Sequence, residues 1–202
     1  MALPDTVTTL GTYVFYNCLS LQKVTIPSGV TSIPTYTFYG CSSLSYLDLP
    51  ASITSLAANS IANCIGLGYI IFRRSSAPTA ADSTVFSNLP TSCEIIVPKT
   101  QYTSYRNASN YPSFSSYTYS IFATYASGAT LPSSDAMFSS MVWYATIDDL
   151  KHETNPITIG NGNEIYAKVV YGSTPASGLT LSVFSASSDG AVINITGYGS
   201  AS

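Results

Sequence analysis

The sequence predicts a repeat solenoid over residues 1–118, followed by a small all-β domain over residues 119–202. The main observation is a fixed period of 23 residues in the first part, because periods of about 20–50 residues mark stacked coils. The period is lost near residue 119, and short strand-like runs separated by turn residues follow. That change predicts the boundary and the β-structure after it.

The same residue types recur at the same place in three successive repeats. Leu-Pro or Ile-Pro pairs begin at residues 3, 26 and 49. The other recurring sets are Cys18, Cys41 and Cys64; Val7, Val30 and Ile53; Leu10, Ile33 and Leu56; Phe15, Phe38 and Ile61; and Leu21, Leu44 and Leu67. One coil cannot bury its apolar side alone, so these residues are expected to face a core shared by stacked coils.

The end of each repeat predicts a short strand. In the second repeat Leu44, Leu47 and Leu49 are apolar and polar residues stand between them, which favours a strand with its apolar side inward. Pro50 follows at once and has no N–H for a ladder, so it should end the strand. The middle stretch, residues 36–41, predicts a turn or short helical segment on the opposite side of the coil.

This pattern resembles the leucine-rich repeats of the BspA-like, Treponema pallidum type. The stretch IPSGVTSIPTYTFYGCSSLSYLDLP, residues 26–50, and its two neighbours carry the resemblance. Ala77-Pro78, Phe86, Cys93 to Pro98, Tyr102, Tyr105 and Tyr111 look like the irregular last coil and C-terminal cap, which extends it to about residue 118. The resemblance implies inward ladders of Phe and Cys, and binding to host proteins, surfaces or other microbes.

Two arrangements are open to the repeated cysteines. Neighbouring strands lie about 4.8 Å apart and bridged Cα atoms about 4.4–6.8 Å apart, so distance alone does not exclude a disulfide. Parallel side-chain directions and an apolar setting favour a buried ladder of free thiols. Zinc is disfavoured because the sequence has no Cys-x-x-Cys motif and no His near these residues.

The first repeat begins without an atypical cap, because residue 3 is already in register. An uncapped coil exposes a strand edge and apolar interior, which is a template for association. We therefore expect the N-terminal coil to self-associate or to be covered by a partner chain or by a segment missing from this one. The first ten residues also lack the basic, apolar and small-residue regions of a secretory signal.

The second part predicts a small β-sandwich of immunoglobulin-like kind, with Trp143 as its core aromatic. The expected strands are 119–125, which could instead be a linker, and 137–147, 157–159, 164–171, 179–184 and 191–196. Asn161 and Gly162 predict a hairpin turn between Ile159 and Glu164, since both residue types tolerate positive φ. No Cys pair is present, so an antibody-type domain is not expected.

Composition excludes several classes of partner. Charged residues make up 8% of the chain and the net charge is −3. The only adjacent basic pair is Arg73-Arg74, which argues against nucleic acid, since neutralising several phosphates takes a cluster of cations. No apolar run reaches 18 residues, so no membrane insertion is expected. A neutral polar surface with 16 Tyr is common on extracellular and virion proteins.

Catalysis is not expected, and neither is a cofactor or metal. The densest polar group is Asp148, Asp149, His152 and Glu153, which could form a cation site. The favoured interpretation is an exposed loop, because no further ligand follows at motif spacing. The sequence has no Gly-x-Ser-x-Gly elbow, and its ten acids are scattered.

Tyrosines are the best candidates for binding. We select Tyr13, Tyr16, Tyr36 and Tyr39, and the equivalent positions of Tyr16 and Tyr39 predict an aligned stripe. A Tyr ring offers a rigid apolar face and one hydroxyl, which suits recognition of protein or sugar. The alternative is that these rings only pack between coils.

The leading functional prediction is non-catalytic recognition or adhesion, with the repeats as scaffold for contact with a protein or glycan. The alternative is structural: a phage fibre or capsid decoration protein, or a subunit of an extracellular filament, assembling through the N-terminal coil. Either function predicts an extracellular, cell-surface or virion-surface location.

Overall fold

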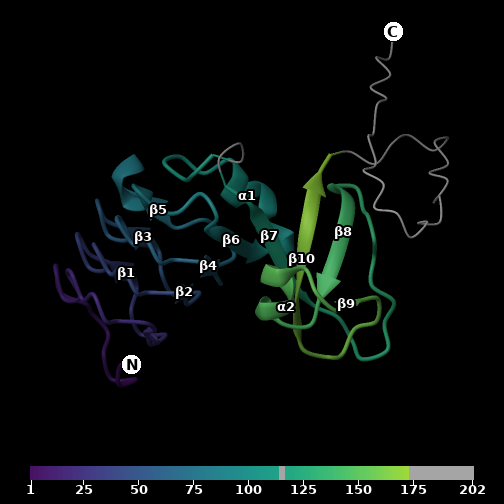
Figure 1. Cartoon of the computed structure of the whole chain (residues 1–202), viewed down its shortest axis with the longest axis horizontal. Coiled ribbons are helices and arrows are strands. Elements are labelled where there is room, and N and C mark those ends of the chain that lie inside the picture. Colours follow the sequence, from purple (N-terminus) through teal and green to yellow (C-terminus); the bar gives the residue numbers. More distant parts are fainter. Residues whose placement is uncertain (114–116, 173–202) are drawn as a thin grey trace, which may run out of the picture.

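Successive repeats pair their strands in parallel, one repeat apart (Figure 1). In the computed structural model, which describes residues 1–113 and 117–172, strand β2 (Tyr46–Leu49) pairs with β4 (Tyr69–Phe72). The register places Tyr46 opposite Tyr69, so the ladder repeats the 23-residue period of the sequence. Strand β4 then pairs with β6 (Glu94–Pro98), and β2 ends at Leu49, directly before Pro50, as predicted.

A second parallel ladder, which the sequence did not predict, runs along another side of the coils. It joins β1 (Ser32–Ile33), β3 (Ser55–Leu56) and β5 (Thr79–Ala80). These strands are only two residues long, too short for period-two alternation to reveal them. Ile33 lies opposite Leu56 and both are buried, so this ladder brings a repeated aliphatic position into the core.

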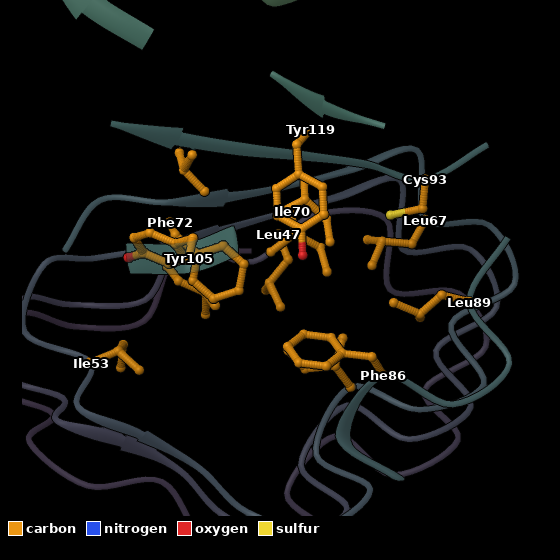
Figure 2. Packing of buried hydrophobic residues seen from close by; sticks show 14 of the residues in the cluster. Leu47, Ile53, Leu67, Ile70, Phe72, Phe86, Leu89, Cys93, Tyr105 and Tyr119 are labelled. Atoms are coloured by element: carbon orange, nitrogen blue, oxygen red, sulfur yellow. The ribbon is translucent and has the colours of Figure 1, made fainter. Parts of the chain in front are cut away.

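The predicted apolar positions form one core that runs through the stack (Figure 2). In the second and third repeats the aligned residues are almost inaccessible to solvent: Val30, Ile33, Phe38, Cys41 and Leu44, then Ile53, Leu56, Ile61, Cys64 and Leu67. In Figure 2, Leu47, Ile70 and Phe72 of the longer strands face Phe86 and Leu89. The repeat-type, mostly-β fold predicted for the first part is confirmed.

The cysteines form a ladder of free thiols. The Cys41 thiol donates to the Phe15 carbonyl oxygen at 3.0 Å, and Cys64 repeats this bond to Phe38 at 3.0 Å. Each thiol therefore satisfies a carbonyl of the preceding coil rather than bonding to another sulfur. Burial raises the pKa of Cys41 to about 11 and that of Cys64 to about 12, so both thiols stay protonated at neutral pH.

At the end of the repeats, tyrosine hydroxyls donate the hydrogen bonds that the backbone of a further coil would supply. The predicted cap contains the short helices η1 (Ser83–Phe86), η2 (Lys99–Gln101) and α1 (Tyr102–Arg106). The buried Tyr105 hydroxyl donates to the carbonyl oxygens of Arg74 and Ser76, at 2.9 and 3.2 Å. Tyr111 donates to Pro78, at 2.8 Å. These bonds satisfy carbonyls that would otherwise accept backbone N–H groups of a next coil.

The longer sheet continues past the predicted boundary at residues 118 and 119. Strand β7 (Tyr119–Thr124) pairs in parallel with β6, and β10 (Glu164–Tyr171) pairs antiparallel with β7. The full order is β2-β4-β6-β7-β10-β8-β9, with β8 spanning Phe138–Tyr144 and β9 Pro156–Ile157. Trp143 is buried, as predicted, and its Nε1–H donates to the Pro132 carbonyl at 2.7 Å.

The immunoglobulin-like sandwich is not confirmed. Residues 117–172 extend one sheet, and the predicted strands 179–184 and 191–196 lie outside the described residues. The division of the chain into two domains stays a prediction.

The predicted hairpin around Asn161 and Gly162 is wrong. Strand β10 already has β7 on one edge and β8 on the other, so no edge is left for residues 157–159. Those residues turn away instead: β9 pairs with β8, and Ile159 bridges Thr130. A Cβ at Gly160 would lie 2.6 Å from the Ala126 carbonyl oxygen, so glycine is required for this close approach.

Replacing Tyr105 by Phe should lower the free energy of unfolding by about 1–2 kcal/mol, because the partly buried carbonyls of Arg74 and Ser76 lose a donor. Thermal unfolding followed by circular dichroism measures this change. The exposed Tyr16 is the matched control, and Tyr16→Phe should change stability by less than about 0.5 kcal/mol. Equal effects of the two substitutions would show that the hydroxyl cap contributes nothing.

Candidate recognition surfaces

The four tyrosines selected from the sequence lie together as one cluster, here called the tyrosine quartet: Tyr13, Tyr16, Tyr36 and Tyr39. Tyr13 stacks on Tyr36 with ring centroids 5.0 Å apart, and Tyr16 stacks on Tyr39 at 5.3 Å. Edge-to-face contacts join the two stacks, at 5.5 Å between Tyr13 and Tyr16 and 5.1 Å between Tyr36 and Tyr39. The predicted alignment of Tyr16 with Tyr39 is confirmed, and Tyr13 and Tyr36 form a second aligned pair.

The quartet is built on turns whose backbone does not favour tyrosine. Tyr13 and Tyr36 have φ values of 61° and 58°, in the left-handed region that L-residues with large side chains avoid. The equivalent residue of the third repeat is Asn59, with φ of 57°, and Asn tolerates this conformation. Two repeats thus carry tyrosine where the backbone favours Asn or Gly, which marks the rings as more than turn residues.

The quartet is accessible. Tyr13 is 54% exposed and Tyr16 is 42% exposed, whereas Tyr36 and Tyr39 are half-buried by their neighbours. About half of the surface of the first two rings faces solvent. In the third repeat Ala62 stands in place of Tyr39, so the aromatic cluster is confined to two coils. Such an arrangement suits contact with another molecule through ring faces, edges and hydroxyls.

A second surface, whose Tyr46 and Tyr69 are candidates from the sequence but not among the four selected tyrosines, lies on the outward side of the longer sheet. Tyr46 stacks on Tyr69 at 5.2 Å, and the Lys23 ammonium lies 5.4 Å from the centre of the Tyr46 ring. The three residues occupy equivalent positions one repeat apart, so the 23-residue period could have aligned them. The period could not predict which other segment of the chain borders this surface.

That segment is helix α2 (Ile147–His152), which packs on the outward face of the sheet. Leu150 is buried against Ile71, Ile96 and Tyr166, in a core separate from that of the repeats. The helix therefore covers the later strands and leaves β2 and the first repeat open.

The acidic group predicted to lie in an exposed loop belongs to this helix and its caps. The Thr146 hydroxyl accepts the Asp149 N–H at 3.1 Å, and Glu153 ends the helix with φ of 54°. Bonds from the Thr146 hydroxyl and the Asn155 amide lower the pKa of Asp149. Asp148 lies 3.5 Å from the His152 ring nitrogen, one helical turn away. Within residues 1–113 and 117–172, no three His, Cys, Asp or Glu side chains are grouped to hold a metal ion.

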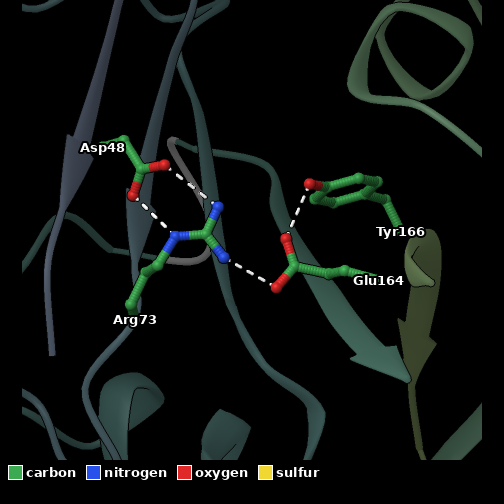
Figure 3. A network of polar contacts seen from close by, with 4 residues as sticks. All are labelled: Asp48, Arg73, Glu164 and Tyr166. Atoms are coloured by element: carbon green, nitrogen blue, oxygen red, sulfur yellow. Dashed lines mark hydrogen bonds and ion pairs between the residues drawn. The ribbon is translucent and has the colours of Figure 1, made fainter. Parts of the chain in front are cut away.

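Arg73 links the repeats to strand β10 (Figure 3). Its guanidinium donates two hydrogen bonds to Asp48 of β2, at 2.8 and 3.0 Å, and one to Glu164 at 2.6 Å. The Tyr166 hydroxyl completes the network by donating to Glu164 at 2.7 Å. Desolvation of the guanidinium lowers the pKa of Arg73, but the two carboxylates raise it by more. The net effect is a raised pKa, so Arg73 stays charged at neutral pH.

Comparison with known proteins agrees with the repeat pattern. The model of the BspA type leucine rich repeat region matches residues 1–123, with 6 copies. This match covers more than half of the 202 residues, and the chain therefore belongs to the BspA type leucine-rich repeat family. A comparison with curated proteins finds no match. None of the helices in the described part of the chain is long and apolar enough to cross a membrane.

Replacing Arg73 by Gln should lower the free energy of unfolding by about 1–2 kcal/mol, because two half-exposed carboxylates lose a shared donor. Urea denaturation measures the change. Arg74 is the matched control: it is exposed and donates one bond, to the Ala51 carbonyl, so Arg74→Gln should cost less than about 0.5 kcal/mol. Equal effects would mean that the network does not anchor β10.

Proposed function

We propose that this protein is a non-catalytic recognition or adhesion protein exposed on a cell or virion surface, and that the tyrosine quartet is its contact surface for a protein or glycan. Family membership supports the general class, since BspA type repeats are typical of surface-associated recognition proteins. The observation that carries the proposal is the quartet itself: its four rings stack on one another, Tyr13 and Tyr16 are exposed, and Tyr13 and Tyr36 have a positive φ that disfavours tyrosine.

The physical argument rests on how an interface gains free energy. Rings already fixed by stacking lose little side-chain entropy on binding, so more of their contact energy appears as affinity. Exposed Tyr residues are enriched at protein interfaces, because the apolar ring and the hydroxyl contribute together. No carboxylate or ammonium belongs to the quartet, which favours neutral partner surfaces.

The third repeat supplies substitutions that the fold accepts. Tyr13→Asn and Tyr36→Asn copy Asn59, and Tyr16→Ala and Tyr39→Ala copy Ala62. The quadruple variant should keep the circular dichroism spectrum of the native chain and lose at least about tenfold in affinity for its partners. Binding partners are first found on arrays of immobilised glycans and extracellular matrix proteins. The affinity for each partner found is then measured by surface plasmon resonance.

Ile159→Ser is the matched control, because Ile159 is a large apolar residue, 58% exposed, outside the quartet. It should bind as the native chain does. A folded quadruple variant that binds every positive as tightly as the native chain would overturn the assignment of the quartet as contact surface.

A second candidate function is structural, as a subunit of a virion or extracellular filament. The observation that favours it is the partial exposure of the first repeat. Val7 and Leu10 are half-buried, whereas Val30 and Ile33, their equivalents, are inaccessible. Nearby Val14 is 46% exposed. We propose that a second copy of the chain covers this apolar surface.

Light scattering after size exclusion tests this assembly. The native chain should elute as a dimer or larger species at about 100 μM, whereas the double variant Val14→Thr and Leu19→Ser should be monomeric. Both substitutions copy the equivalent residues Thr37 and Ser42, so the fold should tolerate them. A native chain that elutes at 21.4 kDa would exclude assembly of the isolated protein.

A further inference from the structure

Two hollows adjoin on the outward side of the sheet, where helix α2 leaves the first strands uncovered. The first has a volume of about 310 Å³ and is lined by Lys23, Thr25, Tyr46, Asp48 and Arg73, among others. The second, of about 270 Å³, lies between Tyr46, Tyr69 and helix α2. The Tyr46 ring lines both, so an extended ligand can occupy them together across one aromatic side chain.

The first hollow presents a positive charge that no described carboxylate pairs with directly. The Arg73 guanidinium is already paired with two carboxylates, those of Asp48 and Glu164, so it is not available to pair with a ligand. Lys23 lies beside the Tyr46 ring instead, with its ammonium 5.4 Å from the ring centre, and the neighbouring Tyr46 raises the pKa of that ammonium. An accessible ammonium beside an aromatic ring is a binding point for an acidic group.

The second hollow offers groups of both signs. Asp148 and Lys151 of α2 face Ser45 and the two tyrosines. Lys151 fits closely because residue 68 is glycine: a Cβ there would lie 3.2 Å from the Lys151 Nζ atom. The equivalent residues of the earlier repeats are Gln22 and Ser45, so the third repeat alone among these leaves this space.

We propose that the adjoining hollows, between Lys23 and helix α2, bind an acidic oligosaccharide. Its carboxylate pairs with Lys23, and its hydroxyls donate to Asp148 and accept from Lys151 and the tyrosine hydroxyls. A polyphosphate or acidic peptide fits less well, because Asp48 and Asp148 repel additional anions and the Asp148 carboxylate can only accept hydrogen bonds. A sugar supplies many hydroxyl donors with few charges. The site is distinct from the tyrosine quartet and does not depend on it.

Calorimetric titration with uronic-acid and sialic-acid oligosaccharides tests the proposal, using their neutral methyl esters and an oligoglutamate peptide for comparison. At least one acidic sugar should bind, its ester about tenfold more weakly, and the peptide not detectably. Lys23→Ala should lower the affinity for the acidic sugar to that of its methyl ester. Gly68→Gln should also weaken binding about fivefold or more, by displacing Lys151 without removing a charge.

Two controls separate this site from other causes. Arg74→Ala removes an exposed charge outside the hollows and should leave affinity unchanged. The quadruple quartet variant should also bind the acidic sugar normally, so failure of one proposal leaves the other standing. The proposal is overturned if no acidic sugar binds at millimolar concentration, if Lys23→Ala binds as tightly as the native chain, or if oligoglutamate binds in place of the sugar.

Discussion

Parallel pairing at a register of one repeat is the interaction on which the rest of this structure depends. Because Leu47 pairs with Ile70, and Ile33 with Leu56, paired residues of the second and third repeats lie beside their equivalents. That register converts the periodic sequence into columns of similar residues. Apolar columns close the core, the Cys column satisfies carbonyls of the preceding coil, and tyrosine columns form stacks.

A parallel ladder leaves unpaired backbone groups where the repeats stop. At its C-terminal end, this chain pairs them in two ways. Tyr105 and Tyr111 donate to carbonyl oxygens of the last coil, so side chains take over the role of a strand backbone. Strand β7 then continues the longer sheet in parallel, and β10 reverses its direction. Arg73 ties this extension back to β2 through Asp48 and Glu164, so the two parts share a polar anchor as well as a sheet.

The same register explains why the two proposed contact surfaces lie so close in sequence. Tyr13 to Tyr16 and Lys23 are only a few residues apart, yet the first group lies on turns and the second on the outward side of the strands. The quartet is neutral and aromatic, whereas the hollows combine an aromatic ring with an ammonium and carboxylates. A single scaffold thus presents two chemically different surfaces.

The 23-residue period determined which residues enter the core, which strand Pro50 ends and which tyrosines align, because stacking preserves sequence periodicity directly. It did not reveal that the sheet crosses residue 118, because β7 pairs with β6 at an offset of 24 residues without repeating the apolar and Cys pattern of the first three repeats. The hairpin prediction failed because the Asn-Gly turn reports only on the local sequence. Both edges of β10 pair with other strands, β7 and β8, so no edge is free for a hairpin partner. Likewise, only tertiary packing of Leu150 on the sheet placed helix α2 beside Tyr46 and Tyr69 and so created the hollows.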